Sequence, residues 1–251
     1  MLDRLRDRSI SHDELPFWNN TSFLKQPNIE KRFNQKLISR TFATPVNPNF
    51  YIDQFSTNAF IEFDGSSQTM REHGCGIVSL HHILGTLIEG YENTVGELAA
   101  FALSFHRNDL LNMEGRVIKK GTPVLAKNIG WYHDALLHTA SQFEVKGHRI
   151  EGVELIDVAK EYASIVNVNT RVLSIISVKD NYKRPHLNGD SSHLVVASGF
   201  KFNFRGNLSE IMITDPNVHI SNGNHINEWV KIDRMAPESF LKKAMFFYTD
   251  K

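Results

Sequence analysis

Residues 68–87 read QTMREHGCGIVSLHHILGTL, and this stretch decides the fold of the chain. Apolar residues with helical spacing follow Cys75, so we expect a buried helix from Cys75 to about Glu89. The cysteine stands at the start of this helix, where unpaired backbone N–H groups and the positive end of the helix dipole favour thiolate over thiol. Because the thiolate is the nucleophilic form, the position suits covalent chemistry.

Cys75 is the only cysteine among 251 residues, so the chain cannot form an internal disulfide, which fits a reducing compartment. A lone cysteine is often simply a small buried hydrophobe. Here Gly74 and Gly76 flank it, and a tight turn that delivers a side chain to a cleft needs such residues. The flanking glycines therefore favour a nucleophile over a buried thiol.

Two downstream residues complete a possible catalytic group. His193 opens the apolar run HLVVASGF, and Asp215 closes the run IMITD. A hairpin through residues 201–209 would bring Asp215 alongside the strand of His193. Cysteine-based acyl transfer needs a base, a group that orients the base, and donors that face the oxyanion. Cys75, His193 and Asp215 can fill the first roles if the helix packs on these two strands.

Asp215 has competitors for the orienting role. Aspartate before proline often simply opens a turn after a strand, and Pro216 follows here. Asn217 and Asp190 are the alternatives that the sequence leaves open.

The order of the expected elements indicates an α+β fold. A capping box at Thr94–Glu97 begins a second helix. Residues 106–130 are expected to be loop with short ordered pieces. We expect further helices at 131–142, 154–166 and 237–243, and strands at 59–64, 143–150, 171–178, 193–200, 210–214 and 245–249. Helices come first and strands follow, which is typical of α+β and not of alternating β-α-β units.

This combination resembles the bacteriocin-processing (double-glycine) peptidase family of papain-like cysteine peptidases. The resemblance covers roughly residues 59–249. It rests on glutamine followed by Cys75-Gly76 and an apolar helix, then Ser192–Val196, Thr214–Pro216 and a late Phe-Leu-Lys-Lys helix. It implies a papain-like fold, in which an N-terminal helical half carries the nucleophile at a helix start. This half packs on a C-terminal antiparallel sheet that carries the histidine and the aspartate.

The resemblance also assigns roles to residues. Cys75 would be the nucleophile, His193 the general acid and base, and Asp215 the orienting acid. Gln68 would donate to the oxyanion, together with the backbone N–H of Cys75. The family usually places its glutamine six residues before the cysteine, whereas here 75 − 68 is seven and the sixth position is Thr69. Either the turn holds one extra residue or another donor, such as His73, takes the role.

We expect two regions, an N-terminal extension at 1–55 and a papain-like peptidase domain at 56–251. Four prolines interrupt the first region, which also carries aromatic residues, so it is either a segment that wraps over the domain or a disordered tail. The stretch between Cys75 and His193 is longer than in short family members, which suggests insertions within 106–150.

The predicted function is a cysteine peptidase that hydrolyses peptide bonds through an acyl-enzyme. The resemblance suggests peptide or protein substrates cut after small residues such as Gly-Gly. Two alternatives remain open: an acyltransferase or transglutaminase-like enzyme on the same triad, and a peptide-binding module without turnover.

Composition restricts partners and location. Lys+Arg and Asp+Glu both number 28, so net charge gives no support for a nucleic-acid partner. No apolar stretch is long enough to span a bilayer. The N-terminus lacks the apolar core of a secretory signal, so we expect a cytoplasmic protein, with export by another route left open. We expect no cofactor, and no histidine spacing indicates a metal site. Nothing indicates an oligomeric state.

Overall fold

The computed structural model describes residues 39–55, 60–63, 66–112, 114–126, 130–166, 170–183, 191–217, 225–235 and 237–250. For residues 60–63, 66–68, 110 and 237 only the backbone is described. All of these residues belong to one compact unit, Leu37–Lys251.

The helical part comes first along the chain. Its helices are α3 (Met70–His73), α4 (Cys75–Leu87), α5 (Val95–Leu103) and α6 (His133–Ser141), and a later helix, α7, spans Leu155–Val166. The predicted helix after Cys75 is confirmed, and so is the capping box, in which Thr94 and Glu97 bond reciprocally at the start of α5. None of the helices in the described ranges has the length and apolar character needed to cross a membrane.

A seven-stranded antiparallel sheet forms the second part. Its strands run in the order β12-β11-β10-β9-β13-β8, and β1 also pairs with β10. Their bounds are β1 Arg40–Ala43, β8 Lys146–Glu151, β9 Arg171–Lys179, β10 Ser192–Phe202, β11 Leu208–Thr214, β12 Glu228–Lys231 and β13 Phe240–Thr249. The predicted α+β class, with a helical half packed on a C-terminal antiparallel sheet, is confirmed.

Strand β10 is long enough to hold three neighbours. Its first half pairs with β9, its second half pairs with β1 on the same edge, and β11 lies along the other edge. The register places Val196 opposite Thr214. The expected hairpin between β10 and β11 is therefore present, and it brings the residue after β11, Asp215, beside the beginning of β10.

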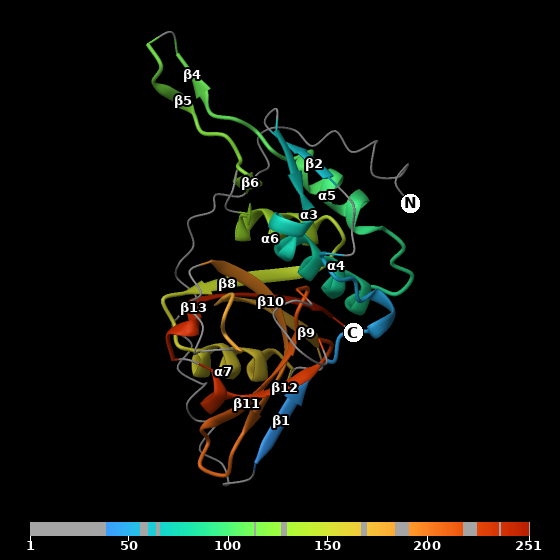
Figure 1. Cartoon of the computed structure of the whole chain (residues 1–251), viewed down its shortest axis with the longest axis vertical. Coiled ribbons are helices and arrows are strands. Elements are labelled where there is room, and N and C mark those ends of the chain that lie inside the picture. Colours follow the sequence, from blue (N-terminus) through green and yellow to red (C-terminus); the bar gives the residue numbers. More distant parts are fainter. Residues whose placement is uncertain are drawn as a thin grey trace. The chain divides into compact units, whose positions relative to one another are not determined.

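Side chains alternate between two covered faces of the sheet, as the pleat of a strand requires. On one face, Leu173 and Ile175 of β9 join the core formed with α4, α5 and α6. The other face is covered by α7, whose buried Tyr162 packs on Phe200 of β10. Figure 1 shows α7 on the opposite side of the sheet from α4 and α6. Coverage of both faces explains why residues 172–178 of β9 are all buried and why the strand is mostly apolar.

The segment at 106–130 is loop with short ordered pieces, as expected, and these pieces pair as hairpins. One hairpin pairs β4 (Leu110–Leu111) with β5 (Val117–Lys119), and another pairs β6 (Leu125–Ala126) with β7 (Gly130–Trp131). A separate hairpin before α3 pairs β2 (Phe60–Phe63) with β3 (Ser66–Thr69).

The expected helix at 237–243 is wrong. Only a single 3-10 turn, η4, spans Pro237–Ser239, and the chain then enters β13 at Phe240. Phe240 pairs with Val178, and pairing resumes at Ala244 after an irregularity that includes Lys242 at φ 56°. Pairing with β9 on one edge and β8 on the other outweighs the local helix propensity of Phe-Leu-Lys-Lys. The late helix that contributed to the family resemblance is thus a strand.

A segment of the predicted extension, residues 44–55, connects the sheet to the helical half; we call it the strap. The Thr44 N–H donates to Ser198 O at 2.8 Å, on β10. The Asn47 N–H donates to Thr86 Oγ1 at 2.9 Å, on α4. In the middle of the strap, the Phe50 ring packs directly on Gly85 of α4. The strap therefore packs on both parts that carry the candidate site.

The strap makes a specific stability prediction at Gly85. A Cβ there would lie 2.2 Å from Phe50 Cγ and 2.7 Å from Phe50 Cβ, too close to fit without movement. We expect Gly85→Ala to lower the free energy of unfolding by about 1–2 kcal/mol, because the overlap exceeds the gain in helix propensity. Gly96→Ala is the matched control, since its Cβ would meet no atom closer than Thr94 Oγ1 at 4.0 Å.

We expect the control to raise stability by up to about 1 kcal/mol. Urea denaturation of the two variants and the wild type gives the comparison. Equal effects of the two substitutions would mean that Phe50 does not pack on α4 as described.

Candidate active site

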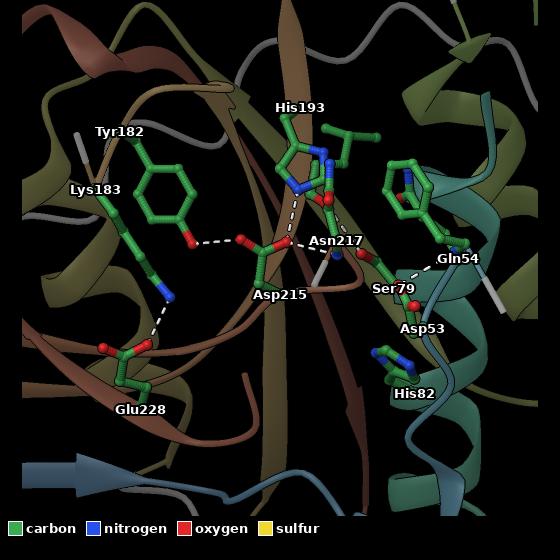
Figure 2. Close-up of polar contacts among 12 residues, drawn as sticks. Asp53, Gln54, Ser79, His82, Tyr182, Lys183, His193, Asp215, Asn217 and Glu228 are labelled. Atoms are coloured by element: carbon green, nitrogen blue, oxygen red, sulfur yellow. Dashed lines mark hydrogen bonds and ion pairs between the residues drawn. The ribbon is translucent and has the colours of Figure 1, made fainter. Parts of the chain in front are cut away.

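His193 and Asp215 form a buried hydrogen-bonded pair at the edge of β10 and β11. The distance from His193 Nε2 to Asp215 Oδ1 is 2.8 Å. The Asp215 side chain is fully buried and that of His193 is 6% exposed, so water does not screen the contact. Figure 2 shows the carboxylate facing the imidazole beneath the beginning of β10.

Cys75 completes the group from the start of α4. Its side chain is partly exposed, lies at the margin of the core, and is hydrogen-bonded to the His193 ring. The backbone at Leu194 and Gly76 also favours the ionised form of the sulfur and lowers the pKa of Cys75. Because Nε2 of His193 is engaged by Asp215, Nδ1 is the nitrogen left to face Sγ. The structure thus brings together three of the four residues that the sequence nominated.

Two contacts hold the start of α4 against β10. Ser79 lies one turn after the cysteine, and its Oγ donates to Leu194 O at 3.2 Å. Gly76 permits the close approach, because a Cβ there would lie 3.0 Å from Trp131 Cβ and 3.1 Å from Leu194 Cδ1. These contacts place the Cys75 sulfur next to His193 of β10.

Gly74 is also explained by space, and not by the unusual backbone freedom that the sequence suggested. Its φ is −82° and its ψ is −13°, a conformation open to any residue. A Cβ at this position would lie 2.2 Å from Met70 O. The glycine therefore lets α4 follow directly on α3.

The electrostatics favour an ion pair between Cys75 and His193. Burial of the thiol opposes its ionisation, but the hydrogen bond and the positive charge of His193 outweigh burial and hold the pKa of Cys75 below its usual range. Burial likewise disfavours a charged imidazole, yet Asp215 and the sulfur together raise the pKa of His193 to about 10. Thiolate and imidazolium are therefore the stable forms near neutral pH.

Asp215 is held by several donors. Its Oδ1 accepts from the Asn217 N–H at 2.8 Å as well as from His193, and its Oδ2 accepts from the Tyr182 hydroxyl at 2.7 Å. Burial raises the pKa of the carboxyl, but the charge of His193 and these bonds lower it further, so Asp215 stays ionised.

The structure also bears on the alternatives to Asp215. Asn217 bonds Asp215 through its backbone N–H. Asp190 lies outside the described residues.

The predicted oxyanion donor Gln68 lies in β3, but its side chain lies outside the described part of the chain. Thr69, at the position where the family has its glutamine, instead caps α3 by accepting the Glu72 N–H at 3.2 Å. His73, the other candidate donor, is the last residue of α3 and is half-buried. Cys75 is the first residue of α4, where backbone N–H groups have no intrahelical acceptor. Gln68 thus stays a prediction.

Sequence reasoning missed three residues that support the site. Tyr182 bonds the Asp215 carboxylate, and the Tyr51 hydroxyl donates to Asp215 O at 3.1 Å. Gln54 connects the loop after β11 with α3. Its backbone N–H donates to Pro216 O at 2.8 Å, and its side-chain Nε2 donates to Arg71 O at 2.9 Å. Their spacing to the site exceeds any local period, so no sequence pattern signals them.

His82 and Trp131, which lie near the site among the described residues, are buried in the fold. His82 shares the face of Cys75 on α4 but is buried against Ile52, with Nε2 3.1 Å from its backbone N and 3.0 Å from its O. Trp131 belongs to the core, whereas Tyr132 is exposed. Among the residues that the structure describes, no group of three or more His, Cys, Asp or Glu side chains could hold a metal ion.

Buried His81 and His82 predict a loss of stability in mild acid. Burial lowers the pKa of His81 to about 4 and that of His82 to about 3. The unfolded chain takes up these protons at about pH 6.5, so this stability is present above that pH and is lost as pH falls toward the folded values. His193 acts in the opposite direction above about pH 6.5, where the unfolded ring loses its proton and the folded ring, with its pKa of about 10, keeps it. At about pH 5 we expect a loss of about 2 kcal/mol for each of the two histidines.

Urea denaturation at about pH 7.5 and about pH 5 measures this loss. His82→Gln, which stays neutral, should reduce the difference by about 2 kcal/mol. An unchanged difference in that variant would mean that His82 is not buried as a neutral ring.

No family model matches the chain, and no curated protein matches its sequence. One similar solved structure is the peptidase domain of Streptococcus ComA, a bi-functional ABC transporter involved in a quorum sensing pathway. The two are 12% identical, with a TM-score of 0.40 over 70% of this chain and 91% of that chain. The chemistry of the site follows from its own geometry.

Proposed function

We propose that the chain is a cysteine peptidase that hydrolyses peptide bonds through an acyl-enzyme. The observation that carries the proposal is the continuous contact from the Cys75 sulfur to the His193 imidazole and on to the buried Asp215 carboxylate. This arrangement holds a thiolate at the start of a helix with a proton donor beside it, which are the two needs of acyl transfer to sulfur.

The reaction runs in two halves. The Cys75 thiolate attacks the peptide carbonyl, a bond forms between Sγ and carbon, and the carbonyl oxygen becomes an oxyanion. His193 gives its proton to the leaving amine as the carbon–nitrogen bond breaks, which leaves an acyl-enzyme. Neutral His193 then takes a proton from water, and the resulting hydroxide attacks the thioester carbon. The carbon–sulfur bond breaks, which releases the acid product and restores the Cys75 thiolate.

Each supporting residue has a defined part. Asp215 keeps the imidazole in the orientation that presents Nδ1 to sulfur and stabilises its positive charge. The backbone N–H of Cys75 and, as we propose, the amide of Gln68 face the oxyanion. We further propose peptide or protein substrates cut after small residues such as Gly-Gly, on the resemblance of the cysteine and histidine segments to double-glycine peptidases.

The test is incubation of the purified protein with a mixed peptide library, with products identified by mass spectrometry. We expect defined cleavage products that are absent with Cys75→Ala. Products that carry an added amine, when glycine amide is supplied as acceptor, would indicate an acyltransferase instead. A reactive Cys75 thiolate without any product would indicate a peptide-binding module.

A further inference from the structure

Tyr182 is the side chain that meets the Asp215 carboxylate on the side away from His193. It lies in the turn after β9, is fully buried, and places its hydroxyl 2.7 Å from Asp215 Oδ2. Figure 2 shows the phenol and the imidazole approaching the carboxylate from different directions.

The two carboxylate oxygens have different partners. Oδ1 accepts from His193 Nε2 and from the Asn217 N–H, both at 2.8 Å, and Oδ2 accepts from Tyr182. Donors on both oxygens fix the rotation of the carboxylate about its bond to Cβ. Charge-assisted bonds of this kind are about twice as strong as neutral ones, so the phenol contributes substantially to this orientation.

The phenol itself is held by the strands around it. The Tyr182 N–H donates to Lys179 O at 3.1 Å, and the Asp180 N–H donates to Ser191 O at 3.0 Å. The next residue, Lys183, forms an ion pair with Glu228 of β12 at 2.6 Å. The turn is thus tied to β9, to the residue before β10 and to β12, which places the hydroxyl before any substrate arrives.

The phenol acts as a donor throughout the working pH range. Burial, followed by the charge of Asp215, raises the pKa of Tyr182 well above its ordinary value. The hydroxyl therefore stays protonated and can only donate to the carboxylate. It does not compete with His193 for the proton that moves during the reaction.

We propose that Tyr182 is a positioning residue that acts through Asp215 and keeps the imidazolium of His193 in place for Cys75. The inference rests on the proposed function. Without the hydroxyl, the carboxylate can rotate and binds a proton more readily, so it stabilises the imidazolium less. A weaker imidazolium stabilises the thiolate less, and Cys75 then ionises at a higher pH.

Other ionisable groups near Asp215 do not interfere with this readout. His82 stays neutral above its pKa of about 3, and burial raises the pKa of Tyr51, which stays protonated. Lys183, the residue after Tyr182, forms its ion pair with Glu228 through its own side chain. The substitution Tyr182→Phe therefore leaves this ion pair in place.

The experiment is the rate of Cys75 alkylation by iodoacetamide from about pH 4 to about pH 9. The single cysteine makes the signal unambiguous. We expect Tyr182→Phe to move the acid limb of the profile upward by about one pH unit. Near the wild-type midpoint of that limb, this shift amounts to several-fold to tenfold slower alkylation.

Tyr162→Phe is the matched control. Tyr162 is equally buried, and its hydroxyl lies 2.8 Å from Ser198 O and 3.0 Å from Val172 O, the two carbonyls to which it can donate, away from Asp215. We expect this variant to lose thermal stability but to keep the wild-type acid limb.

An acid limb of Tyr182→Phe that matches the wild type overturns the inference about Tyr182 and leaves the proposed function intact. Uniform slowing at every pH, with the same loss of melting temperature as in the control, also overturns it, because a structural role alone would explain the result. If the wild-type profile is instead that of a free thiol, Cys75 and His193 form no ion pair. Both the proposed peptidase function and the inference about Tyr182 would then be wrong.

Discussion

We expect Cys75→Ala to abolish the proposed peptide hydrolysis and to leave the fold intact. Turnover falls by a factor on the order of 10⁵ to 10⁶, because loss of the nucleophile removes the covalent route altogether. The side chain is small and partly exposed at the margin of the core, so its removal leaves no large cavity. His193 keeps its bond to Asp215 in this variant. Mass spectrometry of the products measures the loss of hydrolysis, and a thermal melt followed by circular dichroism measures whether the fold is kept.

Cys75→Ser is the matched control, because it keeps a polar atom of similar size beside His193. A hydroxyl ionises far less readily than a thiol, so we expect almost no hydrolysis here either. Hydrolysis by the alanine variant at the wild-type rate would mean that another residue is the nucleophile. Loss of the cooperative melt would show that Cys75 serves packing.

Replacing His193 by glutamine makes Cys75 an ordinary thiol. A glutamine amide can still donate to Asp215 Oδ1, but it carries no charge and accepts no proton at neutral pH. Without the imidazolium, the thiolate fraction at about pH 6 follows the free-thiol pKa of about 8.5, and iodoacetamide alkylation slows by about a hundredfold. We expect the proposed hydrolysis to be lost as well, because no group would then protonate the leaving amine.

His193→Ala serves as the companion variant. It leaves the buried charge of Asp215 without its ring partner, which we expect to lower the free energy of unfolding by several kcal/mol. The glutamine variant keeps a donor for Asp215, so a comparison of the two variants separates the loss of stability from the loss of thiol activation. Alkylation of the glutamine variant at the wild-type rate would mean that the histidine does not activate the sulfur.

Local pattern was sufficient to predict the elements that carry the chemistry. The helix that begins at Cys75 and the hairpin that brings Asp215 to His193 follow from apolar periodicity and from a short turn. Both signals act over a few residues, and neither is opposed by a distant partner. The triad residues could be nominated because cysteine, histidine and aspartate each stand at the end of such an element.

Long-range pairing decided what the sequence did not predict. Strand β1 forms because Arg40 and its neighbours pair with β10, about 160 positions away, so a segment expected as extension enters the sheet. Residues 240–243, expected as helix, instead begin the strand predicted at 245–249, because β8 and β9 pair with both edges of β13. Tyr182 reaches Asp215 from a turn whose own sequence indicates only a loop. In each case the partner becomes visible only in the folded chain.

The most direct test of the ion pair is a pH titration of the ultraviolet absorbance of the Cys75 thiolate. Subtracting the Cys75→Ala spectrum isolates the single sulfur, and the same titration is run on His193→Gln. We expect thiolate absorbance in the wild type at pH values well below the free-thiol pKa of about 8.5, and a return of the transition to that range in the glutamine variant. Coincident titrations of the two proteins would contradict it.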